Sequence, residues 1–419
     1  MAALNDDVER APGGPVAALA VAAGPGQPVP PPRWIRGAAS APFLITGLVF
    51  ASYFVRIPSL KLELGLSEGE LGVFLMLPVL SALAAMQLTG RLVARLGSGT
   101  LLRIVMVALP LSLLAFATAR GRLGFAVVLL VFGAVDGLID ISMNAHAITA
   151  ERALGHPIMN SCHAAWSIGS AVGSLLGGVA LKAGLSLTQH YALVAGAMIV
   201  VAGSVGRHLM PARADRVAPG AEVTSAGRRA RPTWRSGWTT RLLLLALTGT
   251  VVLMVSGVVG SWSGVYLHDD LGASLALASL GYVGYSVFEA GARLIGDRLH
   301  QKLGASLLVR YAGVIAVTGL AAVVLSPGPV VAIVGFAGLG LGLSVVVPII
   351  LGAVGHGGAD PGSGGAADAL AKVNTLTYTG MLVGPMVVGW SAQVVGLAAT
   401  LAGMLVLLAA ALWIGQRAV

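Results

Sequence analysis

The fourth long apolar run of the sequence, residues 123–146, carries Asp136, Asp140 and Asn144 at a four-residue spacing. This spacing places all three side chains on one face of a helix. Two carboxylates one turn apart in a low-dielectric environment cannot easily both ionise, so we expect one of them to hold a proton. Either acid can instead serve only to bond a neighbouring helix. Asp140 and Asp136 are the predicted proton-coupling pair, with Asn144 as a binding residue beside them.

The fifth apolar run, residues 158–181, carries a polar stripe at helical spacing that includes His163, Trp166 and Ser167. Histidine can donate, accept or titrate, and tryptophan offers an apolar face with one donor. We predict that both side chains contact a bound solute. The alternative is that the stripe only joins helices, because serine often does so in membranes.

Glu289 and Arg293 lie four residues apart near the predicted cytoplasmic end of the eighth run, and we expect them to form a local, structural ion pair. No ligand-spacing motif joins the residues that could be imagined as a metal site, which are His146, His163, Cys162 and Asp140. We therefore expect no metal site and no cofactor. The spans show no nucleophile–base pair, so we do not expect an enzyme.

The composition shows which solvent the chain meets. Of its 419 residues, 56% are hydrophobic and 10% are charged, against about 45–50% and about 25% in soluble domains. Hydrocarbon is therefore the main solvent. The formal net charge is +9, but the basic residues fall in short segments between apolar runs. No basic stripe with interleaved aromatics is present, so nucleic acid is not an expected partner.

The apolar runs predict an all-α integral membrane protein with about twelve spans in two six-helix halves. The first half covers 38–210 and the second covers 240–419, and a disordered cytoplasmic tail (1–37) and a basic cytoplasmic linker (211–239) complete the chain. The runs are 38–57, 71–90, 100–119, 123–146, 158–181, 188–209, 241–267, 276–296, 305–326, 329–353, 367–390 and 394–415.

The distribution of positive charge predicts the orientation. If both termini are cytoplasmic, all but five of the 26 Lys and Arg residues lie on the cytoplasmic side or in its flanks. The five exceptions are Arg56, Lys61, Arg120, Arg122 and Lys182. Such a bias places both termini inside and suits a multi-pass protein of the cytoplasmic membrane.

The two halves resemble each other in sequence. FGAVDGLIDISMN (132–144) aligns with FAGLGLGLSVVVP (336–348), and SIGSAVG (167–173) aligns with YTGMLVG (378–384). Both matches fall at the same place in their half, which predicts a parallel six-helix repeat, an architecture of transporters. The alignment pairs Asn374 with His163 and Ser344 with Asp140. Asn374 and Tyr378 are therefore predicted to bind the solute from the second half.

The stretch GLIDISMNAHAITAERALGHPIMNSCHAAWSIGSAVG (137–173) resembles the fourth-to-fifth helix signature of the major facilitator superfamily. More narrowly, it is similar to the bacterial branch related to the fucose–proton symporter. The resemblance implies two halves that rock about a central site. It also implies proton coupling at Asp140, with solute contacts at His163 and Trp166. The seventh-helix stretch VSGVVGSWSGVYL (255–267) departs from that branch, so the substrate does not carry over.

These observations predict a monomeric, proton-coupled secondary transporter for a small sugar-like or other polar solute, with protons and the lipid bilayer as further partners. Proton-driven efflux of a drug or secondary metabolite is the main alternative. It would be supported by a methionine-containing path comprising Met143, Met159, Met254, Met381 and Met386. A non-transporting membrane receptor is the third hypothesis.

Overall fold

The computed structural model describes residues 34–156, 158–211, 238–356 and 366–418, and every regular element in these ranges is a helix. The first six helices are α3 (Trp34–Leu64), α4 (Glu68–Leu96), α5 (Ser98–Thr118), α6 (Gly121–Leu154), α7 (Met159–Lys182) and α8 (Leu187–Gly206). The others are α9 (Thr240–Val265), the π-helix η2 (Tyr266–Asp270), α10 (Leu275–Leu303), α11 (Ala305–Val324), α12 (Pro329–Leu343), α13 (Val346–His356), α14 (Ala366–Val395) and α15 (Leu397–Gly415).

Within the described ranges, ten helical segments are long and apolar enough to cross a membrane, with α9–η2 and α12–α13 each counted as one segment. Only α10 and α14 of the other helices have comparable length, with 29 and 30 residues. They bring the described membrane-length segments to the predicted twelve. Both carry predicted site residues, Glu289 and Arg293 on α10 and Asn374 and Tyr378 on α14.

Local sequence sets several helix starts. Ser67 caps α4 and Ser186 caps α8, each in a capping box with the third residue of its helix. Ser274 and Thr239 accept backbone N–H bonds at the starts of α10 and α9. These caps satisfy backbone donors where the chain turns between spans.

Two predicted boundaries change. α3 begins at Trp34, so the predicted tail is too long by four residues; the rest of the tail and most of the linker lie outside the described residues. The predicted span 329–353 is broken at Ser344 and Val345 into α12 and α13. The break has a covalent cause, because Pro348 lacks the N–H that would bond the carbonyl of Ser344.

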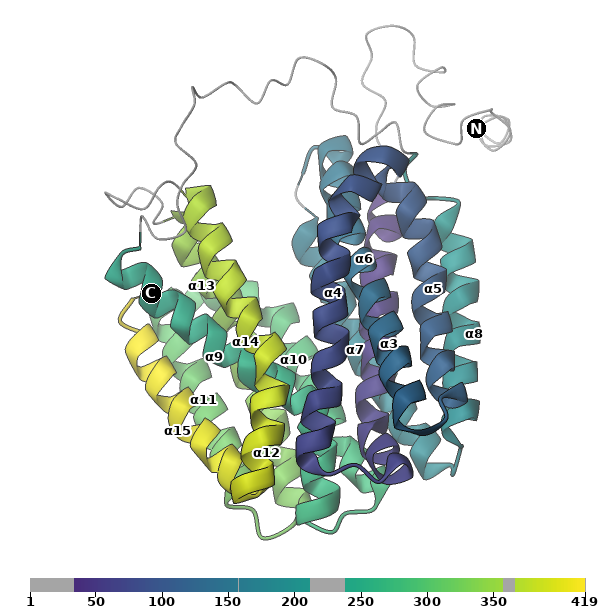
Figure 1. The fold of residues 1–419 in the computed structure, drawn as a ribbon. Coiled ribbons are helices and arrows are strands. Elements are labelled where there is room, and N and C mark those ends of the chain that lie inside the picture. Colours follow the sequence, from purple (N-terminus) through teal and green to yellow (C-terminus); the bar gives the residue numbers. More distant parts are fainter. Residues whose placement is uncertain (1–33, 157, 212–237, 357–365, 419) are drawn as a thin grey trace, which may run out of the picture.

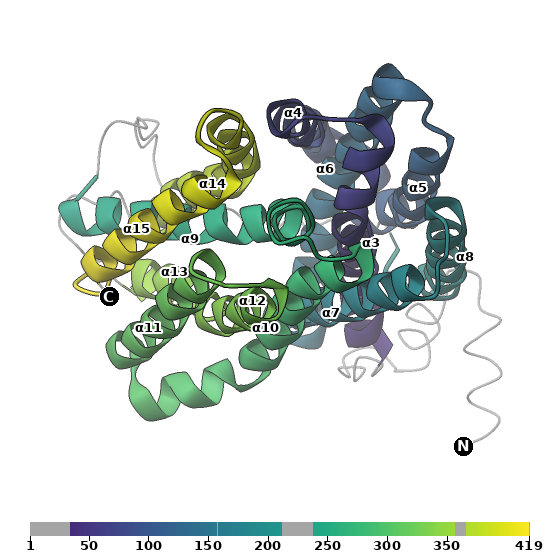
Figure 2. The ribbon, with the colours of Figure 1, turned by 90° about the horizontal axis from the view of Figure 1, so that it is seen from below.

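The two halves repeat one packing scheme (Figures 1 and 2). In the first half α3 packs along α7 and α4 against α6; in the second, α9 packs along α14 and α10 against α12. The halves meet where α7 contacts α10 and where α4 contacts α14. These two interfaces are equivalent when the halves are exchanged, as expected for a parallel six-helix repeat.

Glycines identify equivalent positions in the two halves. Gly169 of α7 lies against the backbone carbonyl of Leu44 in α3, and Gly380 of α14 lies against that of Thr250 in α9. A side chain at either glycine would collide with that carbonyl, so both sites need the smallest residue. This equivalence is the one that the aligned fifth-helix motifs predict.

The fourth-helix alignment is wrong by about one turn. Gly133 of α6 lies against a backbone carbonyl of α4, and Gly340 of α12 lies against the carbonyl at the same distance from the end of α10. Gly133 and Gly340 are therefore equivalent, which moves the register by three residues. Ser344 consequently does not correspond to Asp140. Small and apolar residues recur every turn in both helices, so letter matching alone does not fix their register.

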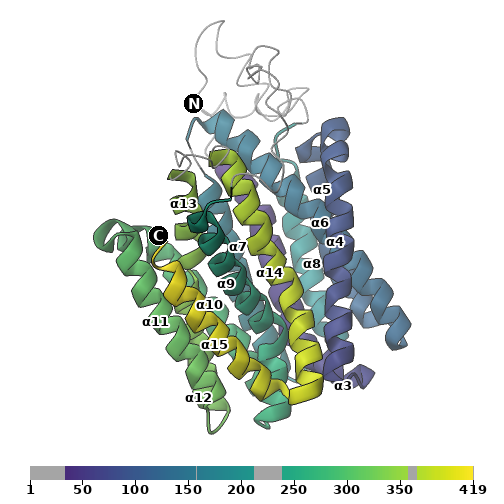
Figure 3. The same cartoon turned by 60° about the vertical axis from the view of Figure 1, so that its left-hand side comes forward.

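The chain connections define two ends of the bundle. At one, called here the linker end, α3 begins, α8 ends and α9 begins; the other, the distal end, holds the turn between α3 and α4. The two halves lie together at the distal end and diverge toward the linker end (Figure 1). Figure 3 shows α14 running along α9 and approaching α4 near the distal end, where Gly72 of α4 and Gly389 of α14 bring the two backbones together.

Candidate functional site

The acids of α6 share one helix face with Asn144. The Asn144 amide donates to the backbone oxygen of Asp140 at 2.8 Å and to its carboxylate at 3.3 Å. Asp136 lies one turn away, and both aspartates are partly exposed. In the described part of the chain neither carboxylate forms an ion pair. Nothing positive therefore compensates their charge directly, and proton uptake is the available way to neutralise them.

On α7, His163 and Trp166 have different surroundings. His163 is exposed and meets the ring of Phe43 edge-on, with centroids 5.3 Å apart. Trp166 is partly buried and packs against the hydrophobic core, and its backbone carbonyl faces Gly47 of α3. His163 is thus available to a solute, whereas Trp166 contributes to helix packing.

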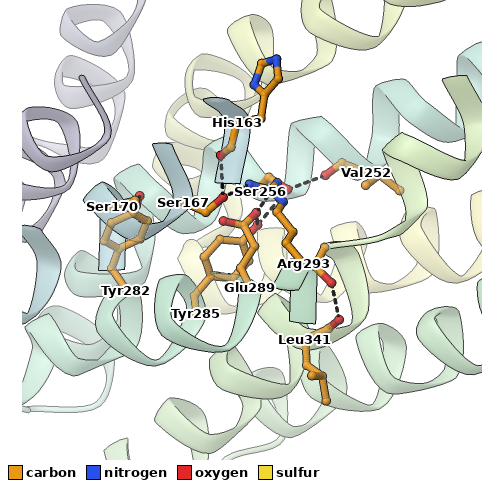
Figure 4. Close-up of polar contacts among 11 residues, drawn as sticks. His163, Ser167, Ser170, Val252, Ser256, Tyr282, Tyr285, Glu289, Arg293 and Leu341 are labelled. Carbon is orange, nitrogen blue, oxygen red and sulfur yellow. Dashed lines mark hydrogen bonds and ion pairs between the residues drawn. The ribbon is translucent and has the colours of Figure 1, made fainter. Parts of the chain in front are cut away.

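Arg293 of α10 joins the two halves. Its Nη2 donates to the Glu289 carboxylate at 3.0 Å, which is the predicted ion pair. Its Nη1 donates to the hydroxyl of Ser167 on α7 at 2.5 Å (Figure 4). The pair is therefore not merely local, because the guanidinium bridges the first half and the second. A charge-assisted bond of this kind is among the stronger polar contacts in proteins.

Glu289 is buried, with 6% of its surface exposed, and it has further polar contacts. The Tyr285 hydroxyl lies 3.2 Å from the same carboxylate oxygen and 3.0 Å from the hydroxyl of Ser256 on α9 (Figure 4). A buried carboxylate needs such partners, since an unpaired one would be very costly. The network extends from α7 through α10 to α9.

The predicted site residues of α14 lie one turn apart, and Asn374 and Tyr378 are both exposed. Tyr378 interacts electrostatically with Asp140 of α6 and with Arg293 of α10. Arg293 also interacts electrostatically with His163. Four helices, two from each half, therefore direct these groups toward one region between the halves.

Sequence reasoning missed Ser167, Tyr285 and Ser256 as members of the network. Ser167 stood in the predicted polar stripe of α7, but the stripe did not show that its partner is on α10. The detectable signal was on α10, where Tyr285 and Glu289 precede Arg293 at intervals of four residues. This spacing places their side chains on one helix face.

More hydroxyl contacts follow the seam between α7 and α10. Ser170 lies 3.0 Å from the Tyr282 hydroxyl, and Ser174 lies 2.7 Å from that of Ser286. All four residues are buried. Short hydroxyl pairs let two helices approach closely without a fixed charge, which suits a seam along which the halves can rotate.

At the distal end an ionic cluster joins the halves. Lys61 of α3 pairs with Asp269 of η2 in the second half and, at 2.9 Å, with Glu68 of α4 in its own half. The backbone N–H of Gly69 donates to the Gln393 side chain of α14 at 3.1 Å. These contacts hold the two halves together on the side opposite the linker.

A helical bundle of two pseudo-equivalent halves, with ionisable groups directed toward their junction, is the architecture of a secondary transporter. The family model described as "Major Facilitator Superfamily" matches residues 158–385. The chain belongs to the major facilitator superfamily, and it is a multi-pass membrane transporter for a small-molecule substrate.

Relatives of similar length support this assignment. The chain is 28% identical over 358 residues to "Uncharacterized transporter y4wD" of Sinorhizobium fredii, an alignment that covers 85% of this chain and 91% of that protein. It is 29% identical over 356 residues to "Membrane protein MosC" of Rhizobium meliloti, covering 85% and 83%. A crystal structure of the nucleoside transporter NupG superposes with a TM-score of 0.68 over 92% of this chain and 98% of that one. At 13% identity it shows the fold alone.

Proposed function

We propose that the protein couples movement of a small polar solute to protons in the cytoplasmic membrane, by alternating access. The observation that carries this proposal is the aspartate pair of α6. Asp136 and Asp140 lie one turn apart in a spanning helix and form no ion pair in the described part of the chain. Asp140 also interacts electrostatically with Tyr378 of the other half. Such acids in a membrane are costly to keep ionised, which favours proton exchange.

In this proposal Asp140 exchanges the coupling proton and Asp136 shares its charge. Asn144, His163, Asn374 and Tyr378 contact the solute, and Trp166 supports α7 from the side of the core. Both termini lie in the cytoplasm, as the distribution of Lys and Arg predicts. The linker end is then cytoplasmic, and the contacts at the distal end make this an inward-facing arrangement. A membrane potential adds about 2.3 kcal/mol per charge per 100 mV to the pH gradient.

Uptake of a sugar-like solute follows from the motif similarity to the fucose–proton symporter-related branch and remains a prediction. Efflux remains the alternative, but its methionine argument weakens. Met143 is buried in the core. Met254 of α9 packs against Gly384 of α14, and Met381 of α14 packs against Gly257 of α9. Met143 and Met254 therefore pack helices together, whereas the side chain of Met381 is also exposed.

The test is proton movement in proteoliposomes that contain a pH-sensitive dye and are challenged with a panel of sugars and related polar solutes. A solute-triggered inward proton flux that disappears in Asp140→Asn would support a symporter. Glu63→Gln is the matched control, because Glu63 is an exposed acid of α3 at the distal end. Undiminished pH-driven transport by Asp140→Asn would refute the coupling assignment.

The same preparation separates the alternatives. Dye-reported proton exchange with hydrophobic drugs, and none with sugars, would favour efflux. A folded protein that moves no solute in either direction, with Asp140→Asn behaving like the wild type, would favour a receptor.

A further inference from the structure

Four oxygen atoms form a chain from α10 to α9. The Glu289 carboxylate oxygen lies 3.2 Å from the Tyr285 hydroxyl, which lies 3.0 Å from the Ser256 hydroxyl. Ser256 lies in turn 3.1 Å from the backbone oxygen of Val252 (Figure 4). A phenol and a serine each hold one hydrogen and can donate it only once. The hydrogens of the two hydroxyls can therefore point toward Glu289 or toward Val252.

The hydroxyl hydrogens can point in either direction along the chain. With Glu289 ionised, Ser256 donates to Tyr285 and Tyr285 donates to the carboxylate, which also accepts from Arg293. With Glu289 protonated, the acid donates to Tyr285, Tyr285 donates to Ser256, and Ser256 donates to the oxygen of Val252. When Glu289 is ionised, two of the three contacts carry a hydrogen, and when it is protonated all three do, so the proton can be added without moving the heavy atoms. A buried acid usually lacks this freedom, because a fixed donor suits only its charged form.

We propose that Glu289 is a second proton-exchanging carboxylate of the transport path, made possible by this reversible hydroxyl chain. The inference rests on the proposed proton coupling and extends it from the first half to the second. The step adds one proton to a Glu289 oxygen and breaks no covalent bond. The ion pair becomes a neutral acid beside a guanidinium, and the hydroxyl hydrogens of Tyr285 and Ser256 turn toward Val252.

The proton changes what Arg293 offers. In the ionised state its two hydrogen bonds go to Glu289 and to Ser167. Once Glu289 is neutral, Ser167 of the first half is the stronger remaining acceptor. A guanidinium has five N–H donors, and weakening of the bond to Glu289 adds one more donor that an acceptor group of the solute can use. Protonation in the second half thereby changes both the contact between the halves and the solute-facing surface.

The described groups that face Glu289 are one cation and otherwise neutral side chains. On α10 itself, Arg293 is the one cation in contact with it in the described structure, and Tyr282 and Tyr285 are neutral phenols that interact with it electrostatically. Neighbouring helices α9, α12 and α3 contribute the non-titrating residues Ser256, Gly340 and Phe54 near this stretch of α10. The titrating groups near Arg293 are His163 and Tyr378. Tyr378 in turn interacts electrostatically with Asp140.

Infrared difference spectroscopy of the full-length protein, between alkaline and acidic buffer, tests this directly and needs no known solute. The carbonyl stretch of a protonated carboxylic acid should appear on acidification, and Glu289→Gln should remove one component of it. Glu63→Gln is the matched control for an exposed glutamate. Tyr285→Phe should shift the Glu289 component by breaking the chain, whereas Tyr282→Phe should leave it in place.

A Glu289→Gln spectrum identical to that of the wild type would overturn the inference, because Glu289 would then stay ionised throughout. Asp140→Asn and Asp136→Asn are measured alongside. If they remove bands while Glu289→Gln removes none, the proposed function stands and the second proton site falls. If Tyr285→Phe leaves the Glu289 component unmoved, the hydroxyl chain is not its partner and the mechanism is refuted.

Discussion

The ionic cluster at the distal end should set the balance between the two access states. Lys61 holds one acid from each half, Glu68 at 2.9 Å and Asp269 across the junction. Asp269→Asn removes only the contact between the halves, because Lys61 keeps Glu68 as its counterion. Glu68→Gln is the matched control, since it removes an acid within one half and leaves the bridge.

The magnitude follows from burial. The Lys61 side chain is 10% exposed and that of Asp269 is 25% exposed, so the pair lies between the surface and the fully buried limit. Exposed pairs contribute about 0–1 kcal/mol and breaking a buried one costs about 3–5 kcal/mol. We expect about 1–2 kcal/mol here, which changes the ratio of the two states roughly 5- to 30-fold.

The assay is a distance measurement between spin labels on the two halves at the distal end. Cys162, the only cysteine, is buried and is replaced by serine so that Ala183→Cys and Leu325→Cys, both at exposed positions, carry the labels. Asp269→Asn should increase a long-distance component, and Glu68→Gln should leave it nearly unchanged. An unchanged distribution in Asp269→Asn would show that the bridge does not keep this end closed.

Three further outcomes are expected. Gly169→Ala should lower the thermal unfolding midpoint in detergent, because the new Cβ meets a backbone carbonyl of α3 and such overpacking costs about 1–3 kcal/mol. Gly196→Ala is the control, since its new Cβ meets open space and should leave the midpoint unchanged. Equal midpoints for the two variants would contradict the packing. Arg56→Gln should destabilise the first half by about 1–3 kcal/mol, because the bond from the buried guanidinium to the Leu185 carbonyl is lost. An unchanged thermal unfolding midpoint would show that this bond does not contribute to stability. Ser167→Ala should slow solute-driven proton flux and leave the fold intact, because it removes the hydroxyl through which Arg293 of α10 contacts the first half. A flux equal to that of the wild type would show that this contact takes no part in the transport cycle.

Residue types and their order determined most of the architecture. Low charge and long apolar runs required a helical bundle in lipid, since only such segments satisfy their own backbone bonds there. The shared face of Asp136, Asp140 and Asn144 followed from helical periodicity, and the Gly169–Gly380 equivalence followed from a repeated glycine spacing. These features depend on local covalent geometry and need no knowledge of neighbours.

Tertiary structure alone decided which faces meet. It paired Arg293 with Ser167, more than a hundred residues away, and so turned an expected local ion pair into a bridge between the halves. It moved the α6–α12 register by one turn and put Trp166 against the core. Long-range packing of small residues sets these outcomes, and an apolar sequence that repeats every turn fits more than one register until its partner helix is in place.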